Sequence, residues 1–238
     1  MEIGLRNWFG NSFYELYLFR MRKISILFLL GLAVRLNAQE VIPVTQEPLH
    51  KNVFENEYLR VLDVRIPPGD TTKIHKHATA SVFITLHQVR QGSQVILESR
   101  GTGVRSADRR ITFESFYNQP RIHRVWNSDT SLFHAMDIEI LIKGDKNIGD
   151  SIALDGFRQL FDASLVRTYR VTLKSKQELE LKRSGPVFIV GLNNANKIKV
   201  NKKLFTSEGD FLFVLPNEKI ELKNDDEKEY SFAFLELK

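Results

Sequence analysis

The chain has 238 residues, 42% hydrophobic and 26% charged, so it can build a packed core and is not disordered by composition. Residues 1–38 carry five of the 34 Lys/Arg and two of the 29 Asp/Glu, which leaves 29 bases against 27 acids and gives no support for a nucleic-acid partner. Cysteine is absent, which excludes disulfides, thiolate chemistry and a lipid-modified cysteine anchor.

The first predicted element is a secretory signal peptide. A short basic stretch at 21–23 precedes the apolar run 24–34, and a small-residue cleavage site ends at Ala38. Eleven apolar residues are too few to span a bilayer, which needs about 20. We therefore expect cleavage after residue 38, no stable membrane anchor afterwards, and a periplasmic or secreted protein. An uncleaved anchor is the alternative, and residues 1–20 are interpreted as a spurious upstream extension.

Short strands with frequent turn signals follow from residue 53 onward, which is typical of an all-β sandwich or barrel. The stretch 143–163 interrupts this pattern with three glycines and several acids, and is interpreted as a connector in which 152–154 and 157–161 could form a short helix. The expected strands lie at 58–66, 80–88, 94–98, 110–116, 124–127 and 132–142, and then at 167–173, 178–182, 187–192, 197–200, 211–215, 219–222 and 230–237.

Three histidines carry the chemical signal. His75 and His77 are two positions apart, so on a strand both imidazoles point to the same face and can reach one ion. His123 follows much later, four residues before Asn127. These residues resemble the two sequence motifs of the cupin superfamily: Gly69 and the paired histidines match the first motif, and His123 and Asn127 match the end of the second.

The resemblance covers residues 53–142 and implies a jelly-roll β-barrel with a metal site at His75, His77 and His123. The glutamate of the first motif would fall at 81 or 82, where this chain has Ser81 and Val82. The implied ligand set is therefore three imidazoles without a carboxylate. It suits a divalent metal, with Fe(II) favoured over Zn, Ni or Cu, and leaves coordination positions open. The alternative is that the histidines line a metal-free pocket.

The second half repeats the all-β pattern without histidines. Ile220 stands where His123 stands, Asn224 repeats the asparagine of the second motif, and Glu180 and Lys182 are expected at the positions of the paired histidines. We therefore expect a bicupin of two barrels: a cupin-like domain at 39–142, the connector at 143–163, and a degenerate cupin-like domain at 164–238 that has no metal site and serves packing.

Four further side chains are candidates for the pocket. Ser81 and Phe83 share the inward strand parity of the paired histidines, and Tyr117 lies shortly before His123. His134 shares parity with an apolar face, so it is expected to be either a satisfied interior histidine or a pocket acid/base. Arg121 and Arg124 flank His123, and an arginine there could bind a substrate carboxylate; the alternative is a solvated surface charge. His50 is expected to be exposed in the segment that leads into the first barrel.

Three functions remain open on this basis. The first is a metal-dependent oxygenase of cupin type that acts on a small molecule. The second is a non-catalytic periplasmic protein that binds a sugar or an acid and has lost the metal. The third is a metal-independent isomerase or lyase that uses a histidine as acid/base. Pairing of two copies through sheet edges into a homodimer is compatible with each.

Overall fold

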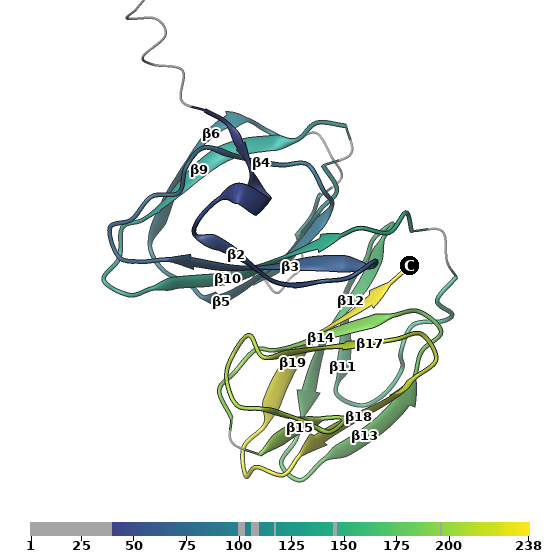
Figure 1. Ribbon diagram of the computed structural model, residues 1–238. Coiled ribbons are helices and arrows are strands. Elements are labelled where there is room, and N and C mark those ends of the chain that lie inside the picture. Colours follow the sequence, from purple (N-terminus) through teal and green to yellow (C-terminus); the bar gives the residue numbers. More distant parts are fainter. Residues whose placement is uncertain (1–39, 100–102, 106–109, 117, 145–146, 196) are drawn as a thin grey trace, which may run out of the picture. The chain divides into compact units, whose positions relative to one another are not determined.

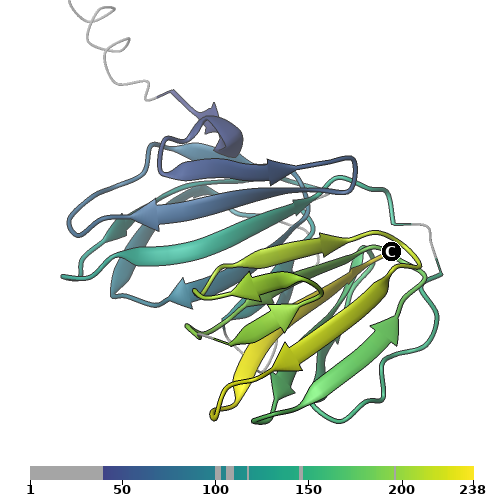
Figure 2. The same cartoon turned by 60° about the horizontal axis from the view of Figure 1, so that its bottom comes forward.

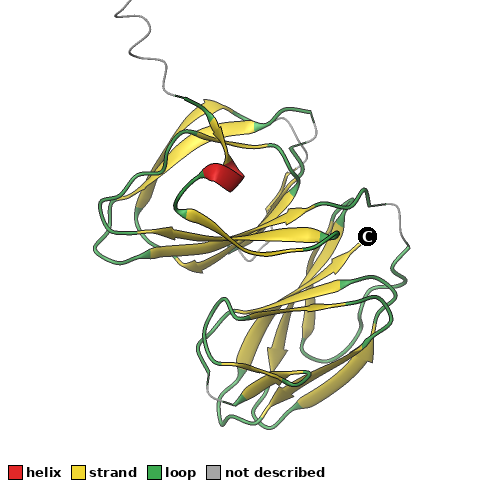
Figure 3. Ribbon diagram, viewed as in Figure 1, coloured by secondary structure: helices red, strands yellow, loops and turns green. Residues whose placement is uncertain are grey.

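The computed structural model describes residues 40–238, apart from 100–102, 106–109, 117, 145–146 and 196. The signal peptide expected at 1–38 lies outside the described residues. The segment Val41–Lys238 forms one compact unit, and its described part is strands and loops with a single 3-10 turn, η1 (Val44–Gln46) (Figure 3). No helix within the described residues has the length and hydrophobicity needed to traverse a bilayer.

The first part of this unit contains two sheets that face each other around η1 (Figure 1). Sheet A has the order β1-β4-β9-β6, and sheet B has the order β2-β3-β10-β5-β8-β7. The strands of sheet A are β1 (Ile42–Pro43), β4 (His75–His77), β9 (Arg121–Asn127) and β6 (Gln91–Leu97). Those of sheet B are β2 (His50–Glu55), β3 (Leu59–Ile66), β10 (Phe133–Ile140), β5 (Ser81–His87), β8 (Ile111–Glu114) and β7 (Gly103–Arg105).

The second part contains two more sheets, drawn in green to yellow in Figure 2. Sheet C has the order β11-β12-β19-β14-β17, and sheet D has the order β13-β18-β15-β16. The strands of sheet C are β11 (Phe157–Asp162), β12 (Val166–Leu173), β19 (Tyr230–Leu237), β14 (Val187–Gly191) and β17 (Phe211–Val214). Those of sheet D are β13 (Glu178–Lys182), β18 (Lys219–Asn224), β15 (Ile198–Val200) and β16 (Lys203–Phe205).

The all-β prediction is confirmed, and each strand range expected from the sequence contains a strand. The short helix considered at 157–161 is wrong, because this segment is β11, which pairs with β12 in sheet C. Phe157, Leu160 and Phe161 pack against the apolar clusters, and the glycine before the strand, Gly156 at a φ of 88°, supplies a sharp turn. The strand β2 was also missed, since the sequence there was interpreted only as an extended lead-in.

Strand β10 is buried along its entire length because both of its faces are covered. Ile138 and Ile140 pack in a large apolar cluster with Leu235 and Leu237 of β19, so the outer faces of sheets B and C share one core. The alternate residues of β10 face the space between sheets A and B. This arrangement explains why β10 reads as a continuous buried strand rather than as a polar–apolar alternation.

The two parts of the unit have the same strand connectivity. Sheet C repeats the order of β2-β3-β10-β5-β8, and β13-β18-β15 of sheet D repeats β4-β9-β6 of sheet A. Buried asparagines fix the correspondence between the parts. Asn127 donates to the carbonyl of Ser131 and accepts from the amide of Asp129, whereas Asn224 donates to the carbonyl of Lys228 and accepts from the amide of Asp226.

Candidate metal centre

Two neighbouring strands of sheet A bring three histidines together. Strands β4 and β9 are antiparallel, with His75 directly opposite His123. The Nε2 atom of His77 lies 3.1 Å from Nε2 of His75 and 3.1 Å from Nε2 of His123. Imidazole nitrogens bound about 2.1 Å from one ion at adjacent positions lie about 3.0–3.4 Å apart. These distances therefore suit three ligands of a single metal ion.

The protonation of His75 is determined by its other nitrogen. Nδ1 lies 2.9 Å from the carbonyl oxygen of Lys73, which can only accept a hydrogen bond, so Nδ1 carries the proton. In the neutral ring Nε2 then presents its lone pair to the other histidines. A backbone carbonyl behind a histidine is a common way to orient a metal ligand.

His77 has a carboxylate behind it. Its Nδ1 lies 3.2 Å from Oδ2 of Asp137, which projects from β10 of sheet B and is 1% exposed. Burial raises the pKa of Asp137 to about 6, so most molecules are ionised there at pH 7. A carboxylate at Nδ1 favours the proton on that nitrogen and leaves Nε2 of His77 as a second lone pair facing that of His75. Two lone pairs 3.1 Å apart repel each other unless a cation lies between them.

Burial and mutual repulsion keep the three imidazoles neutral. Burial, followed by the charges that His77 and His50 would carry, lowers the pKa of His75 to about 3. Burial likewise lowers the pKa of His77 to about 3 and that of His123 to about 2. Metal ligation requires neutral imidazole, so these side chains are in the binding form at any pH where the protein is expected to work.

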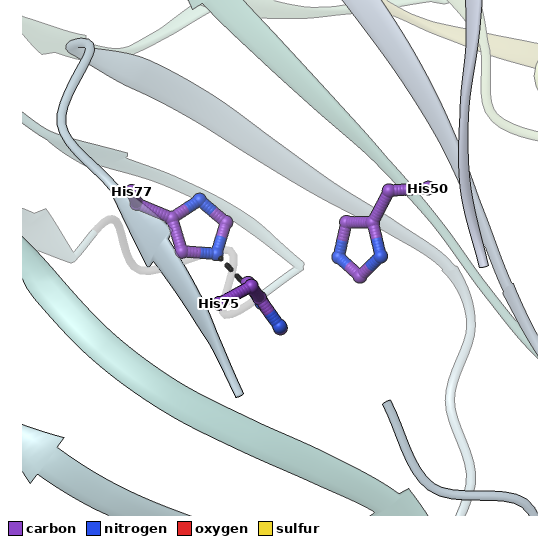
Figure 4. A group of neighbouring side chains, drawn as sticks. All are labelled: His50, His75 and His77. Carbon is purple, nitrogen blue, oxygen red and sulfur yellow. Dashed lines mark hydrogen bonds between the residues drawn. The ribbon is translucent and has the colours of Figure 1, made fainter. Parts of the chain in front are cut away.

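A fourth histidine lies beside this group. His50, at the start of β2, was expected to be exposed, but it is 7% exposed, and one nitrogen from each of His50, His75 and His77 lies within 4.8 Å of the others (Figure 4). The prediction was wrong because η1 folds the lead-in segment back between the sheets. Nδ1 of His50 lies 2.8 Å from Oε2 of Glu47, which is itself buried.

The histidines open into a cavity of about 860 Å³ between sheets A and B. Phe83, which the sequence placed in the pocket, lines this cavity, and its ring centroid lies 5.6 Å from that of His77. Arg121 also lines the cavity, and its Nε is buried without a hydrogen-bond partner. The cavity therefore combines aromatic walls, a cation and the metal-ligating histidines.

The other three candidate pocket residues lie elsewhere or outside the described residues. Ser81 is buried and donates to the carbonyl of Thr79, and it is not among the residues that line the cavity. His134 points to the other side of β10, where Nε2 lies 2.7 Å from Oδ1 of Asp63. It is thus a satisfied histidine, the first of the two alternatives. Tyr117 lies outside the described residues.

The second pair of sheets has a filled apolar interior at the place of this cavity. The strand registers show which residues of the two parts take the same place. His50 lies opposite Val64 and Phe157 lies opposite the corresponding Val171, so Phe157 takes the place of His50. In the same way Phe234 takes the place of Asp137. The rings of Phe157 and Phe234 pack with centroids 5.3 Å apart. One chain therefore carries the same framework twice, and two packed phenylalanines stand in the second half where His50 and Asp137 stand in the first.

The sequence-based match of the paired histidines to Glu180 and Lys182 is wrong by one residue. Leu181 lies opposite Ile220 in sheet D, just as His75 lies opposite His123 in sheet A. The position of His77 is then that of Arg183, the residue after β13. The error arose because the offset between the halves was taken from the sequences of β5 and β14 and not from the strand pairing. In the pairing, Ser81 lies opposite Glu139 and Val187 lies opposite the corresponding residue, Glu236, so Ser81 matches Val187.

Sequence reasoning missed Glu47, His50 and Asp137. For Asp137 a signal was present, because it lies in a largely apolar strand at the parity opposite to His134, and an acid on a buried face needs a partner. For Glu47 and His50 the only signal was their spacing of three residues, which is weak outside a helix.

No protein-family model matches the chain, and the search of curated proteins gives no match. Solved structures do match it. The nickel(II) complex of pirin YhhW from Escherichia coli gives a TM-score of 0.54 at 15% identity and covers 79% of this chain and 90% of that one. AerE from Microcystis aeruginosa gives 0.53 at 10% identity, covering 81% and 98%. Salicylate 1,2-dioxygenase from Pseudoaminobacter salicylatoxidans with gentisate gives 0.52 at 10% identity, covering 79% and 70%. The chain has the cupin fold.

Within this cupin fold the residues present fit a divalent metal. Nε2 of His77 lies beside Nε2 of both His75 and His123, and the Nδ1 atoms of His75 and His77 face a carbonyl and a carboxylate. The glutamate of the first cupin motif has no counterpart at 81 or 82, since Val82 faces the apolar cluster shared with sheet C and Ser81 bonds to the backbone. Asp137 supplies a negative charge behind a ligand instead.

Proposed function

We propose that this protein is an exported cupin that binds a divalent metal, with Fe(II) favoured, through His75, His77 and His123 and acts on a small molecule as an oxygenase. The observation that carries the proposal is that Nε2 of His77 lies 3.1 Å from Nε2 of His75 and 3.1 Å from Nε2 of His123, beside a cavity large enough for a small substrate. A bound metal of this kind would supply open coordination positions for a substrate and for O₂. The likeness to a dioxygenase and to a nickel-binding cupin supports it.

We further propose that the substrate carries an anionic group, such as the carboxylate of an aromatic acid. Arg121 lines the cavity, and Glu98, with which it forms a long ion pair, is 3.9 Å from Nε and mostly exposed. A guanidinium can hold a carboxylate with two parallel hydrogen bonds. Phe83 and Phe133 offer apolar surface to a ring. The solved dioxygenase with gentisate, an aromatic acid, agrees with this substrate class.

The two pairs of sheets are proposed to be two cupin barrels of one bicupin, the first at 39–142. The expected connector at 143–163 contains β11, which belongs to sheet C, so we place the start of the second barrel before Phe157. Export through a signal peptide cleaved after Ala38 is part of the proposal. Mass spectrometry of the protein recovered from the periplasm or medium would give the mature amino terminus and test it.

Elemental analysis tests the metal proposal. The full chain and its His75→Ala/His77→Ala variant are expressed and purified without chelator. We expect about one equivalent of iron, nickel, copper or zinc in the wild type and none in the variant. Folded wild type without metal, after incubation with each ion, would overturn the proposal and favour the alternative of a non-catalytic binding protein. Retention of metal by the variant would place the site elsewhere.

Arg121 is tested separately by titration of the metal-loaded protein with benzoate-type acids and with the corresponding uncharged amides. We expect acids to bind and Arg121→Gln to weaken them by about ten-fold or more, since charge-assisted hydrogen bonds contribute about 1.5–3 kcal/mol. Equal binding of acids and amides would overturn the anionic substrate class and leave the metal site untouched.

A further inference from the structure

We infer that His50 is a fourth protein ligand of the metal, delivered by the lead-in segment and held by Glu47, so that this cupin carries a four-histidine centre. The inference rests on the proposed metal site and adds a residue from a part of the chain that neither of the two recognised motifs includes. The residues that carry it are His50 and Glu47, with His75 and His77 as the neighbouring ligands.

The first argument is the position of His50. Its imidazole is buried, and its ring centroid lies 4.8 Å from that of His75 and 6.3 Å from that of His77. One of its nitrogens lies within 4.8 Å of nitrogens of both. Ligands on opposite sides of an ion are about 4.2 Å apart when each bond is about 2.1 Å. His50 is thus within a small side-chain adjustment of a coordination position.

The second argument is the role of Glu47. Its Oε2 accepts from Nδ1 of His50 at 2.8 Å, so the proton sits on Nδ1 and the lone pair on Nε2. The same carboxylate also accepts from two backbone amides, which fix it in place, so Glu47 orients His50 as Asp137 orients His77.

The third argument is that Glu47 ties the lead-in to the site. The same carboxylate accepts from the amide of Leu49 at 2.6 Å and from the amide of Lys73 at 3.2 Å. The carbonyl of Lys73 in turn orients His75. One buried acid thus sets the positions of two histidines that come from different sheets.

The fourth argument is the internal repeat. His50 corresponds to Phe157, which packs on Tyr169 and Phe234 in the apolar interior of the second pair of sheets. The framework therefore accepts a phenylalanine at this place. A buried histidine with an unused nitrogen is costly where an aromatic hydrocarbon fits, which points to a ligand for that nitrogen.

The test follows the ring nitrogens of the six histidines by ¹H–¹⁵N NMR as one equivalent of Zn(II) is added to the full chain. We expect Nε2 of His50 to shift to the metal-bound range together with those of His75, His77 and His123. The variant His50→Phe introduces the residue found at the corresponding position, Phe157. In this variant only Nε2 of His75, His77 and His123 should shift, and Zn(II) affinity should fall at least ten-fold. His50→Ala provides a second variant if the phenylalanine disturbs folding.

Two further variants complete the design. Glu47→Gln keeps the size of the side chain but removes the charge that orients His50. We expect Zn(II) affinity to fall by about 10–100-fold. The control His87→Phe changes an exposed histidine of the same part of the fold and should leave affinity unchanged. Zinc shifts at three histidines without His50, with equal affinity in wild type and His50→Phe, would overturn this inference alone. Absence of shifts at every histidine would overturn the proposed metal site as well.

Discussion

Asn127 and Asn224 make the same hydrogen bonds in the two halves of the chain. Each is buried, each donates through Nδ2 to the carbonyl four residues ahead at 2.8 Å, and each also donates to the end of the preceding long strand, at Ile66 or at Leu173. These shared bonds hold the turn that returns β9 or β18 into β10 or β19. The asparagine of the second cupin motif is therefore a structural residue in both halves, with or without the histidine.

Replacing either asparagine should destabilise the protein by a similar amount. Asn127→Ala and Asn224→Ala each leave buried carbonyls without donors, so we expect a loss of about 2–4 kcal/mol in the free energy of unfolding. Urea denaturation of the two variants measures it. Asn52→Ala, at an exposed position, should change stability by less than about 0.5 kcal/mol. A large loss for one asparagine and none for the other would contradict the structural equivalence.

Asp137→Asn should weaken metal binding without unfolding the protein. The change removes the charge behind His77 and the preference for the proton on its Nδ1, and such partners contribute about 10–100-fold to metal affinity. Competition with a chelator measures the affinity. Asp63→Asn is the matched control, because Asp63 also lies against a histidine, His134, but away from the cavity. Equal affinity in both variants would argue against the role given to Asp137.

Metal should stabilise the fold. An ion present at 100 times its dissociation constant adds about 2.7 kcal/mol, which raises the Tm of a protein of this size by about 5–10 °C. Differential scanning calorimetry with and without Zn(II) or Fe(II) under anaerobic conditions measures the shift. His123→Ala should abolish most of it. An equal rise in wild type and His123→Ala would mean that the ion binds at some other place.

The pair of Asp63 and His134 should make stability depend on acid pH. Burial raises the pKa of Asp63, but hydrogen bonds from His134 and Arg65 outweigh it, and the net pKa is lowered. Stability from this group is therefore present above about pH 5 and is lost as the pH falls through the folded-state pKa. Glu208, 4.0 Å from His134, and Lys51, opposite Asp63 in β2, also face the pair.

The measurement is the difference in the free energy of unfolding between wild type and Asp63→Asn at several pH values. We expect the wild type to be more stable at pH 6 and the difference to shrink toward pH 3. A difference that stays constant over this range would show that the carboxylate charge contributes nothing.

Much of the fold could be predicted from the sequence because short alternating strands and turn residues are local signals. Histidine spacing likewise predicted that His75 and His77 lie together, since strand parity puts both on one face of β4. The addition of His123 to this group depended on the motif resemblance. Pocket residues were harder: Phe83 lines the cavity, whereas Ser81 satisfies its hydroxyl locally on the backbone.

The residues that escaped prediction depend on contacts between distant segments. His50 and Glu47 enter the interior only because η1 turns the lead-in back over the site, and no local pattern encodes that path. Asp137 matters because β10 of sheet B faces β4 of sheet A. The one-residue error in the second half has the same origin. The pairing of β13 with β18 determines which residues correspond to the paired histidines, and sequence similarity between the halves does not.

Strand β10 separates the cavity from the apolar core that sheets B and C share. One face of β10 carries Asp137 toward the cavity, and the other carries Ile138 and Ile140, which pack against Leu235 and Leu237. We therefore expect that the second pair of sheets cannot be deleted without affecting the first. Cutting the chain before Phe157 would expose the apolar side chains on the outer face of β10 to water. We expect that β10 would then no longer hold Asp137 in place behind His77. We therefore expect the candidate metal centre between sheets A and B to depend on the packing of sheet C against sheet B.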